Sequence, residues 1–170
     1  MLRIRPATEA DNHAIWEMFH EVVSASETFA FDPQMSRQDA LAFWCGGGKH
    51  TYVAEKDGRV SGSYYLNRNQ QGGGAHVANA GYMVSSSARG HHVGRAMCEH
   101  SLAEARSLGF RAMQFNFVVS TNEAALHLWK EFGFDVVGTL PRAFRHPQEG
   151  YVDVYVMFRS LETPPARAAD

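Results

Sequence analysis

The sequence predicts a single α/β domain in which a mixed, mostly antiparallel sheet of about seven strands is flanked by about four helices. One observation is the composition, since 45% of the 170 residues are hydrophobic and 20% are charged, as in ordinary globular domains. A chain of this length buries roughly 70% of the surface that it exposes when unfolded, which is enough for one core. The other observation is the predicted element order, β-α-α-β-β-β-α-β-α-β-β, because hairpins and helical crossovers together give a mixed sheet.

The first third of the chain is predicted to form one strand and two helices. The strand covers residues 2–6, and a box-like cap of Thr8 and Asp11 begins the first helix. After an irregular stretch over residues 24–35, Ser36 caps a second short helix. The first helix carries apolar residues at the spacing of one helical face, namely Ile15, Met18, Phe19, Val22 and Val23.

The middle of the chain is predicted to form three strands. Residues 50–56 and 60–67 form a hairpin, because the Asp-Gly pair between them is a strong hairpin signal. Residues 76–84 form the next strand, in which Gly81 is predicted to mark a β-bulge.

The last part of the chain alternates helices and strands. A helix is predicted over residues 93–108, and Asn122 caps the last helix. Residues 134–140 and 151–158 are predicted as the final two strands. The strand over residues 111–119 alternates so that one face carries Met113, Phe115, Phe117 and Val119.

Composition and spacing also argue against several classes of protein. The formal charge is −2, so no global basic field favours nucleic acid, and no apolar run approaches the ~20 residues that a membrane span needs. Cys45 and Cys98 lie far apart, which favours a reducing cytoplasm over a disulfide scaffold. The nine histidines lack metal-ligand spacing, so we expect no metal. We expect residues 1–160 to form the domain and residues 161–170 to form a flexible tail.

The most informative stretch is the strand-to-helix junction over residues 82–94. Arg89, Gly90 and Gly94 lie in a turn that leads into a helix, where free N–H groups and the positive helix end favour phosphate. The alternative is a plain turn in which glycine only relieves steric crowding. This stretch by itself leaves the two interpretations about equal.

A second segment, residues 122–134, reads N-E-A-A-L-H-L-W-K-E-F-G-F. Together the two segments resemble the GNAT superfamily of acyl-CoA-dependent N-acyltransferases. The first is similar to that family's pyrophosphate loop, R-G-x-G-x-G/A, and the second to its N-x-x-A-x-x-L-Y-x-x-x-G-F helix. The order of elements is also similar from Ile4 to Phe158, so the resemblance implies the GNAT fold and acetyl-CoA as cosubstrate.

The resemblance implies where acetyl-CoA binds. Backbone amides over residues 89–96 would hold the pyrophosphate, and the pantetheine arm would lie between the strands over residues 76–84 and 111–119. A backbone N–H near Met83 would point at the thioester carbonyl, and Asn122 would contact the arm while capping its helix. The cofactor-binding residues implied in this way are Met83, Val84, Arg89, Gly90, His91, His92, Val93, Gly94, Arg95, Ala96, Asn116 and Asn122.

Two positions depart from the family pattern. His92 replaces the middle glycine of the loop, and its N–H stays usable if the residue adopts the right-handed helical region. Trp129 replaces the tyrosine that commonly acts as general acid for the departing thiolate. An indole N–H cannot usefully give up its proton near neutral pH, so we expect Trp129 to serve packing instead.

A narrower resemblance concerns the acceptor. Residues 79–82 (N-A-G-Y), residues 115–122 (F-N-F-V-V-S-T-N) and the L-W pair of the last helix resemble the fungal proline-analogue N-acetyltransferases, which acetylate azetidine-2-carboxylate and similar imino acids. This implies that Asn79 holds the substrate or the tetrahedral oxygen, while Asn116 and Asn122 serve acetyl-CoA. The alternative for Asn79 and Asn116 is a cross-strand amide pair that only stabilises the sheet.

Other catalytic and binding roles have weaker support. Tyr82 is a candidate proton donor or orienting hydroxyl, and the proton acceptor is a water chain, His76 or Glu27. Phe29 and Phe31 are candidate acceptor-binding residues, and a satellite core cluster is their alternative role.

These observations predict an N-acetyltransferase that acts on a small amine or cyclic imino acid by direct attack on the thioester. Residues 27–33 resemble phosphinothricin and methionine sulfoximine acetyltransferases, which is one alternative. A non-catalytic acyl-CoA-binding module and a protein-lysine acetyltransferase are the others. We expect no nucleic-acid or membrane partner, and a homodimer through the last two strands is compatible with the sequence.

Overall fold

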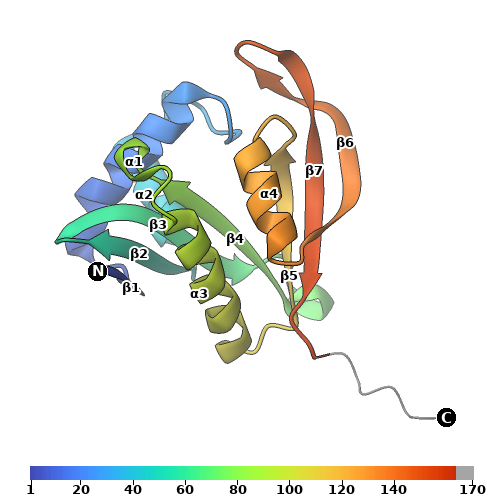
Figure 1. Cartoon of the computed structure of the whole chain (residues 1–170), viewed down its shortest axis with the longest axis horizontal. Helices are drawn as coiled ribbons and strands as arrows, with labels where there is room; N and C mark the ends of the chain where they lie inside the picture. The colour runs from blue at the N-terminus through green and yellow to red at the C-terminus, as the bar shows by residue number, and fades with distance from the viewer. Residues whose placement is uncertain (164–170) are drawn as a thin grey trace.

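The computed structural model describes residues 1–163 (Figure 1). Its strands are β1 (Leu2–Pro6), β2 (His50–Lys56), β3 (Arg59–Arg68), β4 (Val77–Val84), β5 (Ala112–Val119), β6 (Asp135–His146) and β7 (Gly150–Ser160). Its α-helices are α1 (Asn12–Ala25), α2 (Arg37–Cys45), α3 (Val93–Ser107) and α4 (Glu123–Glu131), and short 3₁₀ helices lie at Glu9–Asp11, Gly72–Gly74 and Ser86–Ala88. Within the described residues no helix combines the length and apolarity needed to cross a membrane.

The seven strands form one sheet in the order β1-β2-β3-β4-β5-β7-β6, and every neighbouring pair is antiparallel except β4 and β5. The predicted fold class is therefore confirmed. Side chains alternate between two cores, because Tyr64 packs with residues of α3 and α4 while Tyr65 packs with residues of α1 and α2. We call the second side of the sheet the α1/α2 face.

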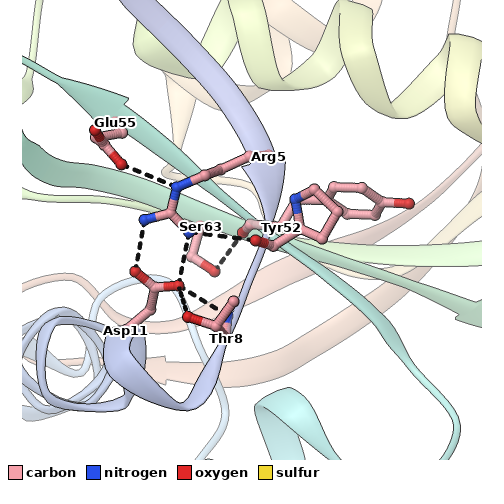
Figure 2. A network of polar contacts seen from close by, with 7 residues as sticks. Arg5, Thr8, Asp11, Tyr52, Glu55 and Ser63 are labelled. Carbon is pink, nitrogen blue, oxygen red and sulfur yellow. Dashed lines mark hydrogen bonds and ion pairs between the residues drawn. The ribbon is translucent and has the colours of Figure 1, made fainter.

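The first helix begins as the Thr8–Asp11 pattern predicts. The Thr8 N–H donates to Asp11 Oδ2 at 2.8 Å, and the Arg5 guanidinium donates to both oxygens of the same carboxylate (Figure 2). Arg5 Nε also donates to Glu55 Oε2 at 2.9 Å, which ties β1 to β2. The Arg5 hydrogen bonds outweigh burial and lower the pKa of Asp11 to about 2.

Several local predictions are confirmed. Ser36 Oγ accepts a hydrogen bond from the N–H of Asp39 at 3.1 Å, so it caps α2. The Asp57-Gly58 pair has φ values of 52° and 75°, which are the positive values of a type I′ hairpin turn. Gly109 has φ 86° and follows the end of α3 as a C-terminal glycine should.

The predicted bulge at Gly81 is wrong. The register between β3 and β4 runs without a shift from Gly62 and Val84 to the other end of the ladder. A Cβ on Gly81 would lie only 2.6 Å from a ring carbon of Tyr65, its partner on β3. The glycine therefore makes room for the Tyr65 ring to lie across β4.

The predicted face of β5 is also wrong in its second half. Met113 and Phe115 are buried in the main core, but the register with β7 shifts between Phe115 and Val118. Val118 therefore enters the main core, Phe117 is 38% exposed, and Val119 joins a small separate cluster. A bulge that is set by the partner strand reverses the alternation at this point.

The C-terminal end differs from the prediction in two ways. β6 continues to His146 through a register shift between Leu140 and Phe144, which accommodates Pro141 where the sequence predicted a loop. The predicted tail begins too early, because Leu161 is buried and its N–H donates to the carbonyl of Arg111 at 2.9 Å. Residues 164–170 of that tail lie outside the described residues.

Candidate active site

An opening between β4 and β5 is the central feature of the candidate site. The two strands pair only from Val77–Asn79 to Ala112–Gln114 and then separate, so β4 has no strand partner on this side beyond Asn79. Figure 1 shows β4 and β5 diverging, with α4 beside β5. Asn79 Nδ2 donates to the carbonyl of Gln114 at 3.0 Å. The side chain of Asn79 thus closes the narrow end of the opening.

The ladder between β3 and β4 decides which N–H groups face this opening. The N–H of Ser85 donates to the carbonyl of Ser61, so these two residues form a hydrogen-bonded antiparallel pair. Hydrogen-bonded pairs recur every second residue, which makes Met83 a partner of Ser63 and turns its N–H toward β3. The N–H near Met83 that is expected to face the thioester is therefore that of a neighbouring residue and not that of Met83 itself. Its neighbour Val84 turns its main-chain groups toward the opening, as do Ala80 and Tyr82.

The turn before α3 has left-handed backbone at two positions. Gly90 has φ 78°, and His92, the N-cap of α3, has φ 60° and ψ 14°. His92 is therefore left-handed, and the right-handed conformation that is the condition for a usable N–H is not adopted. The chain enters α3 by a sharp turn, and His92 adopts there a conformation that glycine would adopt without steric cost.

The first turn of α3 presents main-chain donors. The N–H of Ala96 is the first to find a helical acceptor, the carbonyl of His92. The N–H groups of Val93, Gly94 and Arg95 have no main-chain acceptor within the described residues. They point to the side from which the chain enters, and the positive end of the helix dipole adds to them.

Two contacts bring this turn close to α4. A Cβ on Gly94 would lie 3.6 Å from Leu128 and 3.8 Å from Val84, so α3, α4 and the end of β4 meet at this glycine. The Arg95 guanidinium is paired with Glu131 on α4. Arg95 thus offers a main-chain N–H to a ligand while its charge is already engaged.

The two side chains predicted to be catalytic are not brought together. Tyr82 lies on the α3 side, where its hydroxyl is 2.7 Å from Ser101 Oγ, while Asn79 lies on the α1/α2 face. Burial raises the pKa of Tyr82 well above its ordinary value. A hydroxyl enclosed against α3 does not face an acceptor on the other side of the sheet.

Trp129 packs as predicted. Its side chain is 8% exposed, and its ring centroid lies 4.8 Å from those of Tyr82 and Phe115. The indole therefore bridges β4 and β5 from the α4 side, where the strands separate.

The predicted asparagines belong to a network of amides. Gln114 Nε2 donates to Asn116 Oδ1 at 2.9 Å, and Asn116 Nδ2 donates to Asn69 Oδ1 at 2.6 Å. Asn79 and Asn116 are thus linked through Gln114 and do not form a direct pair. Asn122 Oδ1 accepts the N–H of Ala125 at 3.3 Å, which confirms its role as the N-cap of α4.

Phe29 and Phe31 form part of the core under α1 and α2. Phe29 is stacked with Phe31 at 5.7 Å, and Phe31 contacts Phe43 at 4.8 Å between centroids. Phe43 in turn lies edge-on to Tyr65 at 5.9 Å. The satellite-cluster interpretation holds for both phenylalanines, and the cluster ends at the tyrosine that lies over Gly81.

Two residues on the α1/α2 face lie close to Asn79 although neither was predicted to belong to the site. Tyr65 has its phenol end over Gly81, and burial raises its pKa to about 12. Asn67 lies directly across the ladder from Asn79. The predicted strand bounds carried a signal for both, because pairing residues 60–67 with residues 76–84 puts them beside Asn79 and Gly81.

Over residues 1–163, no group of three or more His, Cys, Asp or Glu side chains is placed to hold a metal.

Comparison with known proteins agrees with the fold and the motifs. A family model described as the Acetyltransferase (GNAT) family matches residues 15–134. The chain is 36% identical over 160 residues to N-acetyltransferase aca1 of Schizosaccharomyces pombe, covering 82% of this chain and 77% of that one. It is 26% identical over 145 residues to L-amino acid N-acyltransferase MnaT of Escherichia coli, covering 83% and 84%. The structure of a GCN5-related N-acetyltransferase from Kribbella flavida superposes with a TM-score of 0.91 at 47% identity, covering 94% and 97%.

Proposed function

This chain belongs to the GNAT acetyltransferase family and is an N-acetyltransferase, and we propose that it transfers acetyl from acetyl-CoA to the nitrogen of a small amino acid or cyclic imino acid. The observation that carries this proposal is the opening between β4 and β5, with outward-facing N–H groups along β4 and amide side chains at its narrow end. The test is release of free CoA thiol from acetyl-CoA by the purified protein across a panel of amines.

The turn before α3 suits the pyrophosphate of acetyl-CoA. The N–H groups of Val93, Gly94 and Arg95 lie at the positive end of a 15-residue helix, where anions bind favourably. A Cβ on Gly90 would meet nothing within 4 Å, so a ligand can approach the main chain closely. We assign residues 89–96 to the pyrophosphate, and Asn116 and Asn122 to the pantetheine arm.

Acetyl transfer in this site relies on main-chain and amide groups. Acetyl-CoA supplies an activated thioester when bound. Tyr82 and Val84 turn their N–H groups toward the opening, where they are placed to stabilise charge on the thioester oxygen. Asn79 is fixed by its bond to Gln114, and its Oδ1 remains to accept an N–H of the acceptor.

Water carries the acceptor's proton in this mechanism. An amine with a pKa near ~10 is under about 1% neutral at pH 7.5, so it must lose a proton before it attacks. An asparagine amide cannot accept that proton, and the Trp129 indole cannot supply one to the thiolate. Turnover therefore rises with pH, because the neutral amine is the reactive form.

The size of the acceptor follows from what covers the α1/α2 face. The aromatic cluster of Phe29, Phe31 and Phe43 extends to Tyr65 and covers this face close to Asn79, which favours a small acceptor over a large one. The Escherichia coli relative is named for L-amino acids, which supports acceptors of this class.

Two alternatives give different results in the same assay. If CoA is released only with phosphinothricin or methionine sulfoximine, the protein is an acetyltransferase for that class of acceptor and not for cyclic imino acids. Tight binding of acetyl-CoA with no release across the panel favours a non-catalytic acyl-CoA-binding module.

We also propose that two copies associate through β6 and β7. Val136, Val137, Leu140 and Tyr151 expose apolar surface on these strands, and β6 is an edge strand. Light scattering at several concentrations tests this, with Val137→Lys as the interface variant. A monomer mass for the wild-type protein at high concentration would contradict it.

A further inference from the structure

A row of polar side chains crosses neighbouring strands on the α1/α2 face. Asn67 on β3 pairs with Asn79 on β4, and Asn79 pairs with Gln114 on β5. Lys49 directly precedes β2, whose first residue, His50, pairs with Leu66, the neighbour of Asn67 in the chain. Side chains on neighbouring strands at one level of a sheet are about 5 Å apart at Cβ. One cation therefore lies next to the end of β2, on the same face of the sheet as this row of amides.

The Lys49 ammonium is half-buried and has no anionic partner within 4 Å among residues 1–163. Its Nζ lies 4.4 Å from the ring centroid of Phe43 and 5.4 Å from that of Tyr65. Aromatic faces hold a cation in place but leave its hydrogen-bond donors unused. Burial lowers the pKa of Lys49, as expected for an ammonium that has lost water without gaining an anion.

The neighbouring amide also lacks a partner. Asn67 Oδ1 is the buried side-chain polar atom that has no hydrogen bond within the described part of the chain. The other amides of the network, Asn69, Asn79, Gln114 and Asn116, each make at least one side-chain hydrogen bond. Buried polar groups are almost always paired, so an unpaired oxygen beside an unpaired cation calls for a ligand that satisfies both.

We propose that Lys49 binds the carboxylate of the acceptor, while Asn67 and Asn79 accept hydrogen bonds from its nitrogen. This rests on the proposed function and narrows the acceptor to compounds with a carboxylate on the carbon next to the nitrogen. Only one carbon separates the two groups in such a compound, which matches amide oxygens at paired positions of β3 and β4 and a cation next to the end of β2. Polyamines and protein lysine side chains do not fit, because they have no carboxylate next to the nitrogen to neutralise Lys49.

The chemical step leaves Lys49 unchanged. The acceptor nitrogen forms a bond to the acetyl carbon, the carbon–sulfur bond breaks, and the electron pair goes to the CoA sulfur. The ammonium loses one proton to water before the attack, the nitrogen loses a second proton to water as the amide forms, and the CoA thiolate takes up one proton from water. Asn67 Oδ1 accepts a hydrogen bond without taking a proton. Lys49 stays protonated and acts through binding, so its loss should appear mainly in the acceptor KM.

Two acceptor probes that differ only in charge test the carboxylate contact. Azetidine-2-carboxylate and azetidine-2-carboxamide are compared at equal concentrations of neutral amine. The wild-type enzyme is expected to favour the carboxylate by about tenfold or more in kcat/KM, since charge-assisted hydrogen bonds are the strong ones. Lys49→Met keeps an unbranched side chain of similar length and removes the charge.

The expected result is an interaction between variant and probe. Lys49→Met should raise KM for the carboxylate about tenfold and leave the carboxamide and acetyl-CoA values within about threefold. Lys49→Arg should recover most of the loss, and Lys56→Met, at an exposed lysine of β2, is the matched control. Asn67→Leu should raise KM for both probes, because the nitrogen contact is common to them.

Equal effects of Lys49→Met on both probes, or no effect on either, would overturn the assignment. The assignment of Lys49 would also be overturned if the wild-type enzyme releases CoA with amines of every kind and does not prefer the carboxylate. The acetyltransferase function would stand in that case. Silence of the wild-type enzyme with all acceptors would overturn the proposed function itself. Thermal unfolding of each variant separates loss of fold from loss of binding. If Lys49→Met is unfolded, Lys49→Arg still tests the carboxylate contact, because it keeps the positive charge and should keep the preference for the carboxylate probe.

Discussion

Replacing His92 by glycine is expected to stabilise the enzyme. His92 has φ 60° and ψ 14°, a region that costs a non-glycine residue about 1–2 kcal/mol. Glycine removes that cost but loses about 0.5–1 kcal/mol through the greater freedom of the unfolded chain. The difference is about 0–1.5 kcal/mol, so the expected net gain in the free energy of unfolding is its midpoint, about 0.75 kcal/mol. For a domain of this size that raises Tm by about 1–4 °C.

The adjacent histidine provides the control. His91 is not among the residues with positive φ, so glycine there relieves no steric cost and only adds freedom to the unfolded chain. Differential scanning calorimetry of the two variants should show Tm rising for His92→Gly and falling for His91→Gly. A fall of similar size in both variants would refute the left-handed placement of His92.

The same variant separates two ways of binding phosphate. If the turn binds acetyl-CoA through main-chain N–H groups, His92→Gly should change the Kd by less than about threefold, because glycine keeps both the N–H and the backbone conformation. Isothermal titration with acetyl-CoA measures this. A tenfold loss of affinity in a more stable protein would mean that the imidazole itself contacts the ligand.

Four further changes test other parts of the account. Gly94→Trp should abolish acetyl-CoA binding in a titration while circular dichroism stays native, because the indole would fill the space where α3, α4 and β4 meet; unchanged affinity would remove the pyrophosphate assignment. Asn79→Ala should lower kcat about tenfold or more while changing the Kd for acetyl-CoA little; normal steady-state kinetics would discard its role in the site. Asp11→Asn should lose about 2 kcal/mol of unfolding free energy at pH 7, since the Arg5 hydrogen bonds lower the pKa of Asp11 from 3.8 to about 2. This stabilisation is present above about pH 4 and disappears as the pH falls through 2, so urea unfolding of wild type and variant should converge in acid; a constant difference would contradict the assignment. Trp129→Phe should cost about 1–3 kcal/mol in urea unfolding and keep most of kcat, whereas a large loss of rate in a stable protein would make Trp129 catalytic.

The parts of the fold that the sequence predicted well depend on residues close together in the chain. The Ser36 cap, the Asp57-Gly58 turn and the glycine after α3 each follow from one backbone conformation and its nearest neighbours. The apolar spacing of α1 is likewise local, and the structure buries Ile15 as predicted. Element order then restricted the fold to a mixed sheet, which the structure has.

The wrong predictions concern features of a strand that are set by its pairing with another strand far away in the sequence. The bulge in β5 follows from the register with β7, which reversed the face of Phe117. Gly81 accommodates a ring from β3 and does not mark a bulge. Alternation along a regular β4 then separates Asn79 from Tyr82 and turns the N–H of Met83 away from the opening.

The candidate site was predictable in part for the same reason. The turn at Arg89–Ala96 and the cap at Asn122 lie within single segments, and their motifs indicated both. Asn67 becomes a neighbour of Asn79 only through the pairing of β3 with β4, and Lys49 reaches the same face only because β2 pairs with β3. Neither residue has a local motif, so the register of the sheet had to be known before either could be placed.

The most direct test of the account is CoA-thiol release from acetyl-CoA by the purified wild-type protein. The acceptors are azetidine-2-carboxylate, proline analogues, phosphinothricin, methionine sulfoximine, polyamines and a lysine-rich peptide, each at pH 7 and pH 9. The account predicts release with the cyclic imino acids, faster at the higher pH and weak with polyamines and the peptide. No release with any carboxylate-bearing amine, from a protein that binds acetyl-CoA tightly, would contradict it.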